Sequence, residues 1–324
     1  MSDSKGASPT EAVASGPGEA LPDAGSQRLM RLATYASVGV AGLLIAVKLV
    51  AWILTDSVAL LSTLVDSLLD LAASIVNLIA IRTALTPPDK EHRFGHGKAE
   101  PLAALGQSAF IAGSALFLLF EVGKRLITPR AIEQGEVGIW VMVFAILATF
   151  VLTRFQSYVV KKSRSLAIKA DSLHYLGDLL VNVAVIVALL LSTELGWTLA
   201  DPLFGLAIAI YILWTAWKIV RDAFSMLMDE ELPDEARRRI KAIVQAHPEV
   251  RSLHDLRTRA SGPVTFIQLH LEMDGALTLY RAHEVADQVE AEILAAFPGA
   301  EVMIHQDPYG LEEPPTRVGV ARRG

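Results

Sequence analysis

The sequence predicts a membrane protein in which six transmembrane helices precede a small α/β domain with the ferredoxin-like element order α-β-β-α-β. Of the 324 residues, 52% are hydrophobic and only 20% are charged, whereas soluble domains carry about 25% charged residues. The hydrophobic residues are concentrated between about residues 29 and 222, in blocks long enough to cross a bilayer, which takes about 20 residues per helix. The residues that follow have the alternating polarity of an ordinary soluble domain.

Six apolar blocks define the predicted spans. They are residues 30–54, 58–85, 101–127, 136–159, 167–192 and 198–221. The first two blocks are separated by three residues, 55–57, so we expect them to form a tight helical hairpin. Further turns are expected at 128–130 and at 196–197.

The distribution of lysine and arginine predicts the orientation of these spans. Basic residues accumulate before span one, after span two, after span four and at the end of span six. They are Arg28, Arg31, Lys90, Arg93, Lys98, Lys161, Lys162, Arg164, Lys169, Lys218 and Arg221. The opposite loops offer little beyond Arg130 and the neighbouring Lys124 and Arg125. The positive-inside rule therefore places both termini in the cytoplasm.

The C-terminal domain is expected to contain two helices and three strands. Helical periodicity covers 233–247 and 279–297, and strand-like alternation covers 250–259 and 264–273, joined by a turn at 261–263; a short last strand is expected at 301–305. This order predicts a sheet covered by two helices on one face. The domain limits are 28–225 for the membrane part and 226–309 for the soluble part.

Composition excludes several other classes. The tails, 1–27 and 310–324, are expected to be disordered; the first is rich in Ser, Gly, Ala, Pro and acidic residues and lacks the apolar run of a signal peptide. The net charge of −6 argues against nucleic acid as the main partner. Because the chain has no cysteine, a metal site has to use His, Asp and Glu.

Two pairs of ionisable residues lie inside the apolar spans. Asp66 and Asp70 are four residues apart in the second span, and His174 and Asp178 are four residues apart in the fifth. Residues at this spacing share one helix face. A lone Asp or His in a membrane helix can simply bond to a neighbouring helix, but intramembrane charges are costly and usually functional. Three carboxylates and an imidazole form a complete tetrahedral ligand set for a divalent metal such as zinc.

This set of residues also predicts a proton-coupled transport reaction. Three ionised carboxylates in a poorly hydrated site would repel one another, so some should hold protons when no metal is bound, and metal binding must displace them. A site that opens alternately to the two sides would then work as an antiporter. The imidazole favours zinc, with Cd²⁺ and Fe²⁺ as further candidates. Since His174 lies near the start of its span and Asp66 lies deeper, span five must begin early or tilt for all four residues to meet.

Seven of the eight histidines occupy candidate metal positions. Asp89, His92 and His96 lie together in the loop after span two, where Gly95 and Gly97 would let the loop fold back; a solvated polar loop is the alternative. In the soluble domain the candidates lie on different elements of one small fold. They are His254, His270, His283, His305, Gln306 and Asp307. Each alone is consistent with a surface side chain, and together they indicate a metal cluster.

Several sequence strings resemble the cation diffusion facilitator family, in particular its bacterial zinc and ferrous-iron efflux branch. The strings are VDSLLD (65–70), HRFGHGKAEPLAAL (92–105), ADSLHYLGD (170–178), HDLRTRASGP (254–263), IQLHLEM (267–273) and IHQDP (304–308). They occur in order, and the likeness extends over about residues 30–309.

The resemblance implies a homodimer in the bacterial inner membrane that exports zinc in exchange for protons and uses no organic cofactor. It assigns Asp66, Asp70, His174 and Asp178 to transport, and Asp89, His92 and His96 to a loop site. The histidines of the soluble domain, with Gln306 and Asp307, would form a binuclear site between the two cytoplasmic domains, where metal stabilises the dimer and senses supply. Lys98 and Asp229 would pair to tie the membrane part to the soluble part.

Two other classes of protein fit part of this pattern. A membrane-anchored metal sensor would use the cytoplasmic histidines for signalling and would need no intramembrane ligands. An intramembrane metallohydrolase would use the same ligands with an open position for water. It would also need a nearby general base, and the sequence offers none beside the four intramembrane residues.

Overall fold

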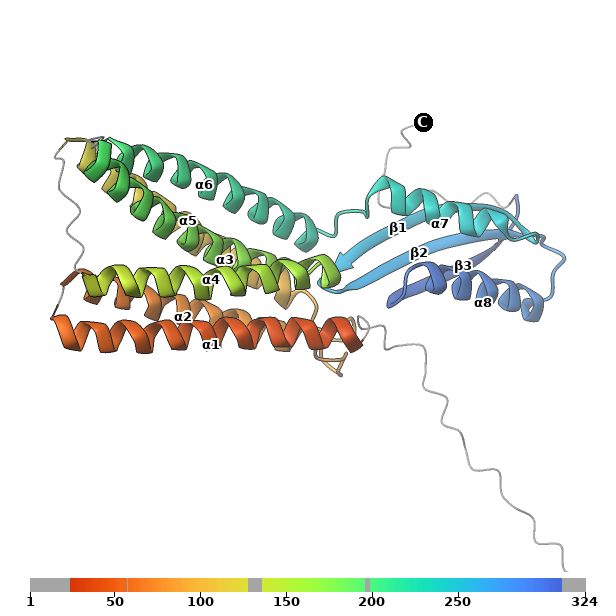
Figure 1. The fold of residues 1–324 in the computed structure, drawn as a ribbon. Coiled ribbons are helices and arrows are strands. Elements are labelled where there is room, and N and C mark those ends of the chain that lie inside the picture. Colours follow the sequence, from red (N-terminus) through yellow and green to blue (C-terminus); the bar gives the residue numbers. More distant parts are fainter. Residues whose placement is uncertain (1–23, 57, 128–135, 196–198, 311–324) are drawn as a thin grey trace, which may run out of the picture.

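The computed structural model describes residues 24–56, 58–127, 136–195 and 199–310. Six long helices form a bundle, and a three-stranded sheet with two shorter helices extends from one end of it (Figure 1). Each of the six has the length and apolar composition needed to cross a membrane. The fold class predicted from the sequence is therefore confirmed.

The bundle helices agree with the predicted spans to within a few residues. They are α1 (Ala24–Thr55), α2 (Val58–Ala84), α3 (Ala99–Ile127), α4 (Glu136–Ser163), α5 (Leu166–Leu195) and α6 (Ala200–Leu227). Because α1 begins at Ala24, the end of the tail expected to be disordered is helical. The remainder of that tail, the tail from 311 onward and the expected turns at 128–130 and 196–197 lie outside the described residues.

The start of α5 is fixed by acceptors from two other segments. Glu100 of α3 accepts hydrogen bonds from the backbone N–H groups of Leu166 (2.5 Å) and Ala167 (3.4 Å), and the Ser165 hydroxyl accepts one from Ile168 (3.2 Å). The first N–H groups of a helix have no acceptor within the helix, and negative charge is favourable at that end. These contacts hold the end of α5 that carries His174, about two turns further along.

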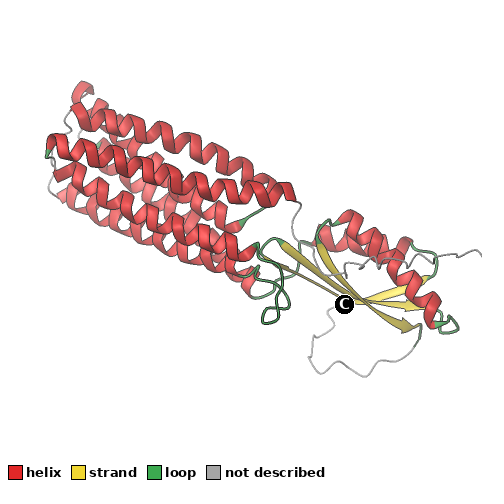
Figure 2. Cartoon of the chain, turned by 90° about the horizontal axis from the view of Figure 1, so that it is seen from below, coloured by secondary structure: helices red, strands yellow, loops and turns green. Residues whose placement is uncertain are grey.

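The soluble domain follows the predicted order. Its elements are α7 (Asp234–Ala246), β1 (Val250–Ser261), β2 (Val264–Met273), α8 (Leu279–Ala296) and β3 (Ala300–Pro308). The central strand β2 is antiparallel to β1 and parallel to β3. Both helices cover one face of the sheet (Figure 2). The last strand is longer than the predicted 301–305 because it pairs with β2 along its whole length, which brings Gln306 and Asp307 into the sheet.

Alternation along β2 separates an apolar face from a polar one. Leu269 and Leu271 point into a core that also contains Val244 of α7 and Val289 of α8, and all four are at most 1% exposed. His270 lies between the two leucines, so its side chain belongs to the opposite face, which the helices leave uncovered. The sheet therefore presents its histidines away from the hydrophobic core.

The loop between α2 and α3 packs against the β1–β2 hairpin, where backbone segments meet closely. A Cβ added to Gly97 would lie 2.1 Å from the carbonyl oxygen of Ser261, and one added to Gly262 would lie 2.4 Å from the carbonyl oxygen of Gly97. The Phe94 ring meets the Phe266 ring edge to face, 6.1 Å between centroids. This close approach joins the membrane part to the soluble part.

A charged contact lies at the same junction. Asp229, which follows α6, forms ion pairs with Lys98 (3.0 Å) and with Arg259 of β1 (3.3 Å). Partial burial acts to raise the pKa of Asp229, but the hydrogen bonds from Lys98 and Arg259 outweigh it and hold that pKa below its usual value. The three side chains thus connect the α2–α3 loop, the end of α6 and the hairpin.

Gly97→Ala should loosen this junction, because its methyl group has no space beside Ser261. We expect the free energy of unfolding to fall by about 1–3 kcal/mol, as for other forced overpacking, measured by thermal unfolding in detergent. Gly39→Ala is the matched control, since a Cβ at Gly39 meets nothing within 4 Å. Equal stability of the two variants would contradict the close packing described above.

Asp229→Asn should lower the unfolding temperature at neutral pH and have no effect in acid. A depressed carboxyl pKa means that the paired form is fully present above the usual pKa of about 3.9, and that its contribution is lost as pH falls through the folded-state value. Thermal unfolding is measured at pH values from neutral to below that range. Asp255→Asn serves as the control, because Asp255 pairs locally with Arg257 (2.8 Å) within β1. A pH-independent difference would exclude the ionic origin.

Candidate metal centres and family membership

Three of the four predicted intramembrane ligands come together between α2 and α5. The Nε2 atom of His174 lies 3.0 Å from Oδ1 of Asp70 and 3.8 Å from Oδ2 of Asp178. One ligand atom from each residue lies within 4.8 Å of the other two. Ligands bound to a tetrahedral zinc at about 2.1 Å would be about 3.4 Å apart, and the two measured distances bracket that value. The donor set therefore fits a small divalent cation.

The three ligand side chains differ in their exposure to solvent. The His174 side chain is 9% exposed, that of Asp70 is 21% exposed, and that of Asp178 is 43% exposed. On the inner side, the Tyr175 ring meets the His174 imidazole edge to face at 5.6 Å between centroids. The Tyr175 hydroxyl also bonds to Ser74 of α2 (2.8 Å). The site is thus anchored on one side and open to an entering ion on the other.

Asp66 does not join this group. It is exposed on α2, one helical turn beyond Asp70 and farther from the end that carries the soluble domain. Because α5 starts early, at Leu166, His174 lies at the same depth in the bundle as Asp70. Asp66 still lies deeper than His174, as expected from the sequence. Because positions i and i+4 share a helix face, Asp66 still faces the same side of α2 as Asp70.

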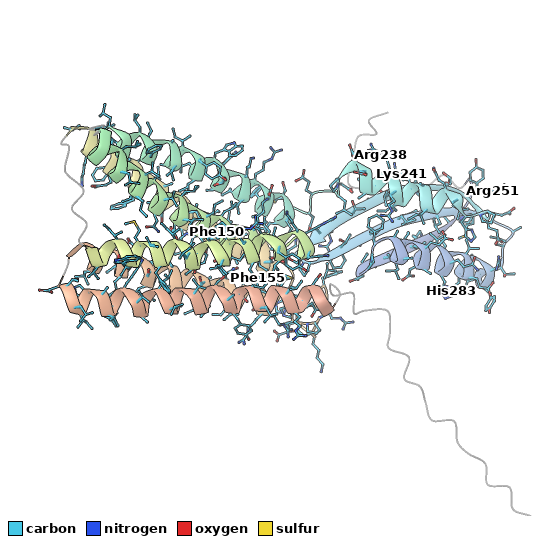
Figure 3. All side chains as sticks on the ribbon, viewed as in Figure 1. Phe150, Phe155, Arg238, Lys241, Arg251 and His283 are labelled. Atoms are coloured by element: carbon cyan, nitrogen blue, oxygen red, sulfur yellow. The ribbon has the colours of Figure 1, made fainter. Side chains whose placement is uncertain are left out.

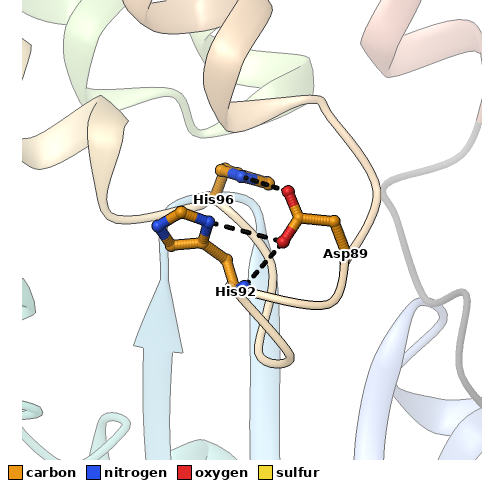
Figure 4. A group of neighbouring side chains, drawn as sticks. All are labelled: Asp89, His92 and His96. Atoms are coloured by element: carbon orange, nitrogen blue, oxygen red, sulfur yellow. Dashed lines mark hydrogen bonds and ion pairs between the residues drawn. The ribbon is translucent and has the colours of Figure 1, made fainter.

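The loop after α2 brings Asp89, His92 and His96 together (Figure 4). Asp89 lies 3.4 Å from Nδ1 of His92 and 3.3 Å from Nε2 of His96, and the two imidazole rings are 4.5 Å apart. Backbone N–H bonds from His92 (2.6 Å) and Glu91 (2.9 Å) to the carboxylate lower the pKa of Asp89. A positive φ of 76° at Gly95 allows the loop to turn back. This carboxylate is therefore ionised and ready to bind a cation.

Three histidines form a row across the uncovered face of the sheet. His254 of β1 pairs with His270 of β2, which pairs with His305 of β3. Asp307 closes the row, with carboxylate oxygens 2.8 Å from His270, 3.2 Å from His305 and 3.5 Å from His254. His254, His270 and Asp307 each offer a ligand atom within 4.8 Å of the other two. The sheet register thus assembles a third cluster from three strands.

Two predicted residues lie apart from this row within the chain. His283 is exposed on α8, where it pairs with Asp287 at 3.5 Å (Figure 3). Gln306 pairs in register with the core residue Leu271. It therefore lies on the opposite face of β3 from His305 and Asp307. His283 belongs to no group of three or more His, Cys, Asp or Glu ligands in the described part of the chain.

Sequence reasoning missed two ionisable residues in the bundle. Lys48 of α1 donates hydrogen bonds to the Thr63 carbonyl (3.0 Å) and to the hydroxyl of Ser67 (2.7 Å). Ser67 directly follows Asp66 in the sequence. Asp171 of α5 is 1% exposed and bonds to Ser37 and Gln156. Both lie inside apolar spans, so the criterion that selected Asp66 and Asp70 would have found them if it had been applied without requiring i, i+4 pairs.

Two family models together match most of the chain. The model for the cation efflux transmembrane domain matches residues 34–228, and the model for the cytoplasmic domain of cation efflux proteins matches residues 232–309. The short name of the second model, ZT_dimer, implies that this domain dimerises.

Similar proteins of full length are bacterial. The cation-efflux pump FieF of Serratia proteamaculans is 50% identical over 284 residues, 88% of this chain and 94% of that protein. The pump of the same name from Pectobacterium atrosepticum is 51% identical over 281 residues, covering 87% and 93%. Among solved structures, the metal-bound C-terminal domain of the CzcD transporter from Thermotoga maritima is 30% identical, covers 24% of this chain and 93% of that chain, and has a TM-score of 0.24.

The family models and the full-length relatives agree with the six-helix bundle and the cytoplasmic α/β domain. They describe a membrane transporter for divalent metal efflux and exclude the metallohydrolase alternative, since this is a family of transporters. The chain belongs to the cation diffusion facilitator family.

Proposed function

We propose that this efflux transporter exports zinc from the bacterial cytoplasm across the inner membrane in exchange for protons. The observation that carries the proposal is the group formed by Asp70, His174 and Asp178, whose ligand atoms lie within 4.8 Å of one another inside the bundle. The relatives named cation-efflux pumps support the direction of transport. The positive-inside pattern orients the protein with both termini and the α/β domain in the cytoplasm.

Zinc is the proposed substrate because the site contains one imidazole and two carboxylates. Imidazole suits zinc and similar transition metals, whereas oxygen-only sites suit Mg²⁺, Ca²⁺ or Mn²⁺; Cd²⁺ and Fe²⁺ are proposed as further substrates. Asp66 would supply the fourth ligand. Its position on the same face of α2, one turn from Asp70, means that a small movement of α2 relative to α5 would bring it to the ion.

Proton exchange follows from the charge of the site. Two carboxylates close to a buried imidazole cannot all remain in their ordinary charge states without a cation, because burial and like charges disfavour ionised carboxylates. Protons therefore occupy the metal-free site, and zinc has to displace them. Alternating access of the membrane part, residues 28–225, to the two sides would couple zinc export to proton entry.

The other two clusters are proposed as regulatory zinc sites. The row of His254, His270 and His305 with Asp307 lies on the uncovered sheet face, which suits contact between two copies of the domain, residues 226–309, in a homodimer. His283 and Gln306 are proposed to complete a binuclear site when two domains meet. The loop group of Asp89, His92 and His96 would bind zinc at the junction with the membrane part.

Asp70→Ala should abolish zinc transport, with at least a 100-fold loss of flux, because it removes the carboxylate closest to His174. Zinc flux into proteoliposomes is measured under an imposed pH gradient. Asp56→Asn is the matched control: Asp56 lies at the α1–α2 turn with φ 50°, a conformation that Asn tolerates. Flux that survives in Asp70→Ala would place the pathway elsewhere. Zinc binding without flux in the unaltered protein would favour a metal sensor.

His174→Asp should weaken the preference for zinc over Mn²⁺, by tenfold or more in the flux ratio. The replacement keeps a ligand at this position but exchanges the neutral imidazole for an anionic oxygen donor, which suits Mn²⁺ better than imidazole does. Competition between the two metals in the same proteoliposome assay gives the ratio. His247→Asn is the control and should leave the ratio unchanged, because His247 ends α7 outside the bundle and belongs to no candidate ligand group in the described residues. An unaltered ratio in His174→Asp would remove the imidazole from the selectivity mechanism.

A further inference from the structure

A second buried carboxyl group lies close to the intramembrane site but outside its ligand set. Asp171 of α5 is 1% exposed, and its Oδ2 atom lies 2.6 Å from the Ser37 hydroxyl of α1 and 2.7 Å from the Gln156 amide nitrogen of α4. The Gln156 amide also donates to Ser37 at 2.9 Å. Three helices thus meet at one carboxyl group.

The groups that hold Asp171 are uncharged. Its other oxygen, Oδ1, is buried and has no hydrogen-bond partner in the described part of the chain. The ionisable groups that act on it are His174 and Tyr175 of its own helix and Asp70 of α2, while α1 and α4 face it with Ser37 and Gln156. An ionised carboxylate without a paired cation is costly in such a place.

Counting hydrogens at Ser37 gives two consistent arrangements. The Ser37 hydroxyl has one hydrogen and two acceptors within reach, Oδ2 of Asp171 at 2.6 Å and the carbonyl oxygen of Ala33 at 3.0 Å. If Ser37 donates to Ala33, the Asp171–Ser37 contact requires a hydrogen on Asp171. If Ser37 donates to Asp171, the Oδ2 atom accepts and needs no hydrogen of its own, which suits the ionised carboxylate. Rotation of one hydroxyl therefore accommodates both charge states without moving a helix.

We propose that Asp171 is a proton-binding group of the transport cycle, separate from the metal ligands. It is a carboxylic acid when the metal site is empty and a carboxylate when a divalent cation is bound by Asp70, His174 and Asp178. On metal binding, the O–H bond of Asp171 breaks, the proton passes to water on the cytoplasmic side, and the Ser37 hydroxyl turns from Ala33 to donate to the new carboxylate. The inference rests on the proposed exchange of metal for protons.

The position of Asp171 supports this role. It lies three residues before His174 on α5, about one helical turn nearer the end of the helix beside the cytoplasmic domain. A dication at the site is close enough to stabilise the carboxylate through the low-dielectric bundle, yet the helix turn between them keeps Asp171 out of the ligand set. A proton released here leaves on the side from which zinc enters.

Proton release on zinc binding tests the proposal in the full-length protein in weakly buffered detergent. Asp171→Asn keeps the size and can hydrogen-bond to Ser37 and Gln156, but it cannot release a proton. We expect it to bind zinc and to release about one proton fewer per zinc than the unaltered protein. The loop and cytoplasmic clusters are common to both proteins, so their contributions cancel.

Glu100→Gln is the matched control. Glu100 is also 1% exposed in the bundle, but it accepts the N–H groups at the start of α5 and, unlike Asp171, has no metal ligand among the groups that act on it. This variant should therefore release as many protons as the unaltered protein. Equal release from Asp171→Asn and the unaltered protein would show that Asp171 is only a structural tie. No release from the unaltered protein would instead overturn the proposed antiport.

Two further measurements decide the matter if Asp171→Asn does not fold. Infrared difference spectra of the unaltered protein should show the loss of a protonated carboxyl band when zinc binds; its persistence would overturn the proposal. Ser37→Ala removes the donor that stabilises the carboxylate, so zinc binding should require a higher pH than in the unaltered protein. A purely structural contact would leave that pH dependence unchanged.

Discussion

The bundle depends on one constraint: a polar group surrounded by apolar side chains and lipid must find its partner within the protein. Glu100 satisfies it by accepting the first N–H groups of α5, and Lys48 by donating to α2. His174 satisfies it through Asp70 and Asp178. Each contact joins two helices or fixes a helix end. The groups that are costly to bury are therefore the ones that position the metal site.

Periodicity made much of this architecture predictable. Apolar blocks long enough to span a bilayer gave the six helices, and the shift to alternating residues gave β1 and β2. The i, i+4 spacing predicted that Asp66 shares a face of α2 with Asp70 and that His174 shares a face of α5 with Asp178, because helix geometry determines which side chains of one helix lie together. The strand β3 was predicted too short, since its pairing partner β2 lies far from it in sequence and no local pattern shows where such pairing ends.

The remaining features depend on tertiary contacts that spacing does not encode. Asp66 has the correct spacing but lies one turn too deep, because the depth of α2 relative to α5 is set by packing. Asp171 is bound by Ser37 and Gln156, which come from two other helices, so local spacing does not reveal its environment. His283 and Gln306 have the residue type of a ligand, yet the helix layer and the strand alternation direct them away from the histidine row.

The loop between α2 and α3 has a consequence for how the two parts of the molecule influence each other. Within a few residues it carries the Asp89–His92–His96 group, the Phe94 ring against Phe266 and the Gly97 backbone against the hairpin. A cation that orders the Asp89–His92–His96 group therefore also affects how Phe94 and Gly97 dock against the soluble domain. Thermodynamic reciprocity then requires that any displacement of the cytoplasmic domain changes the affinity of the loop for the ion by the same factor. The loop thus couples ion binding to the position of the cytoplasmic domain.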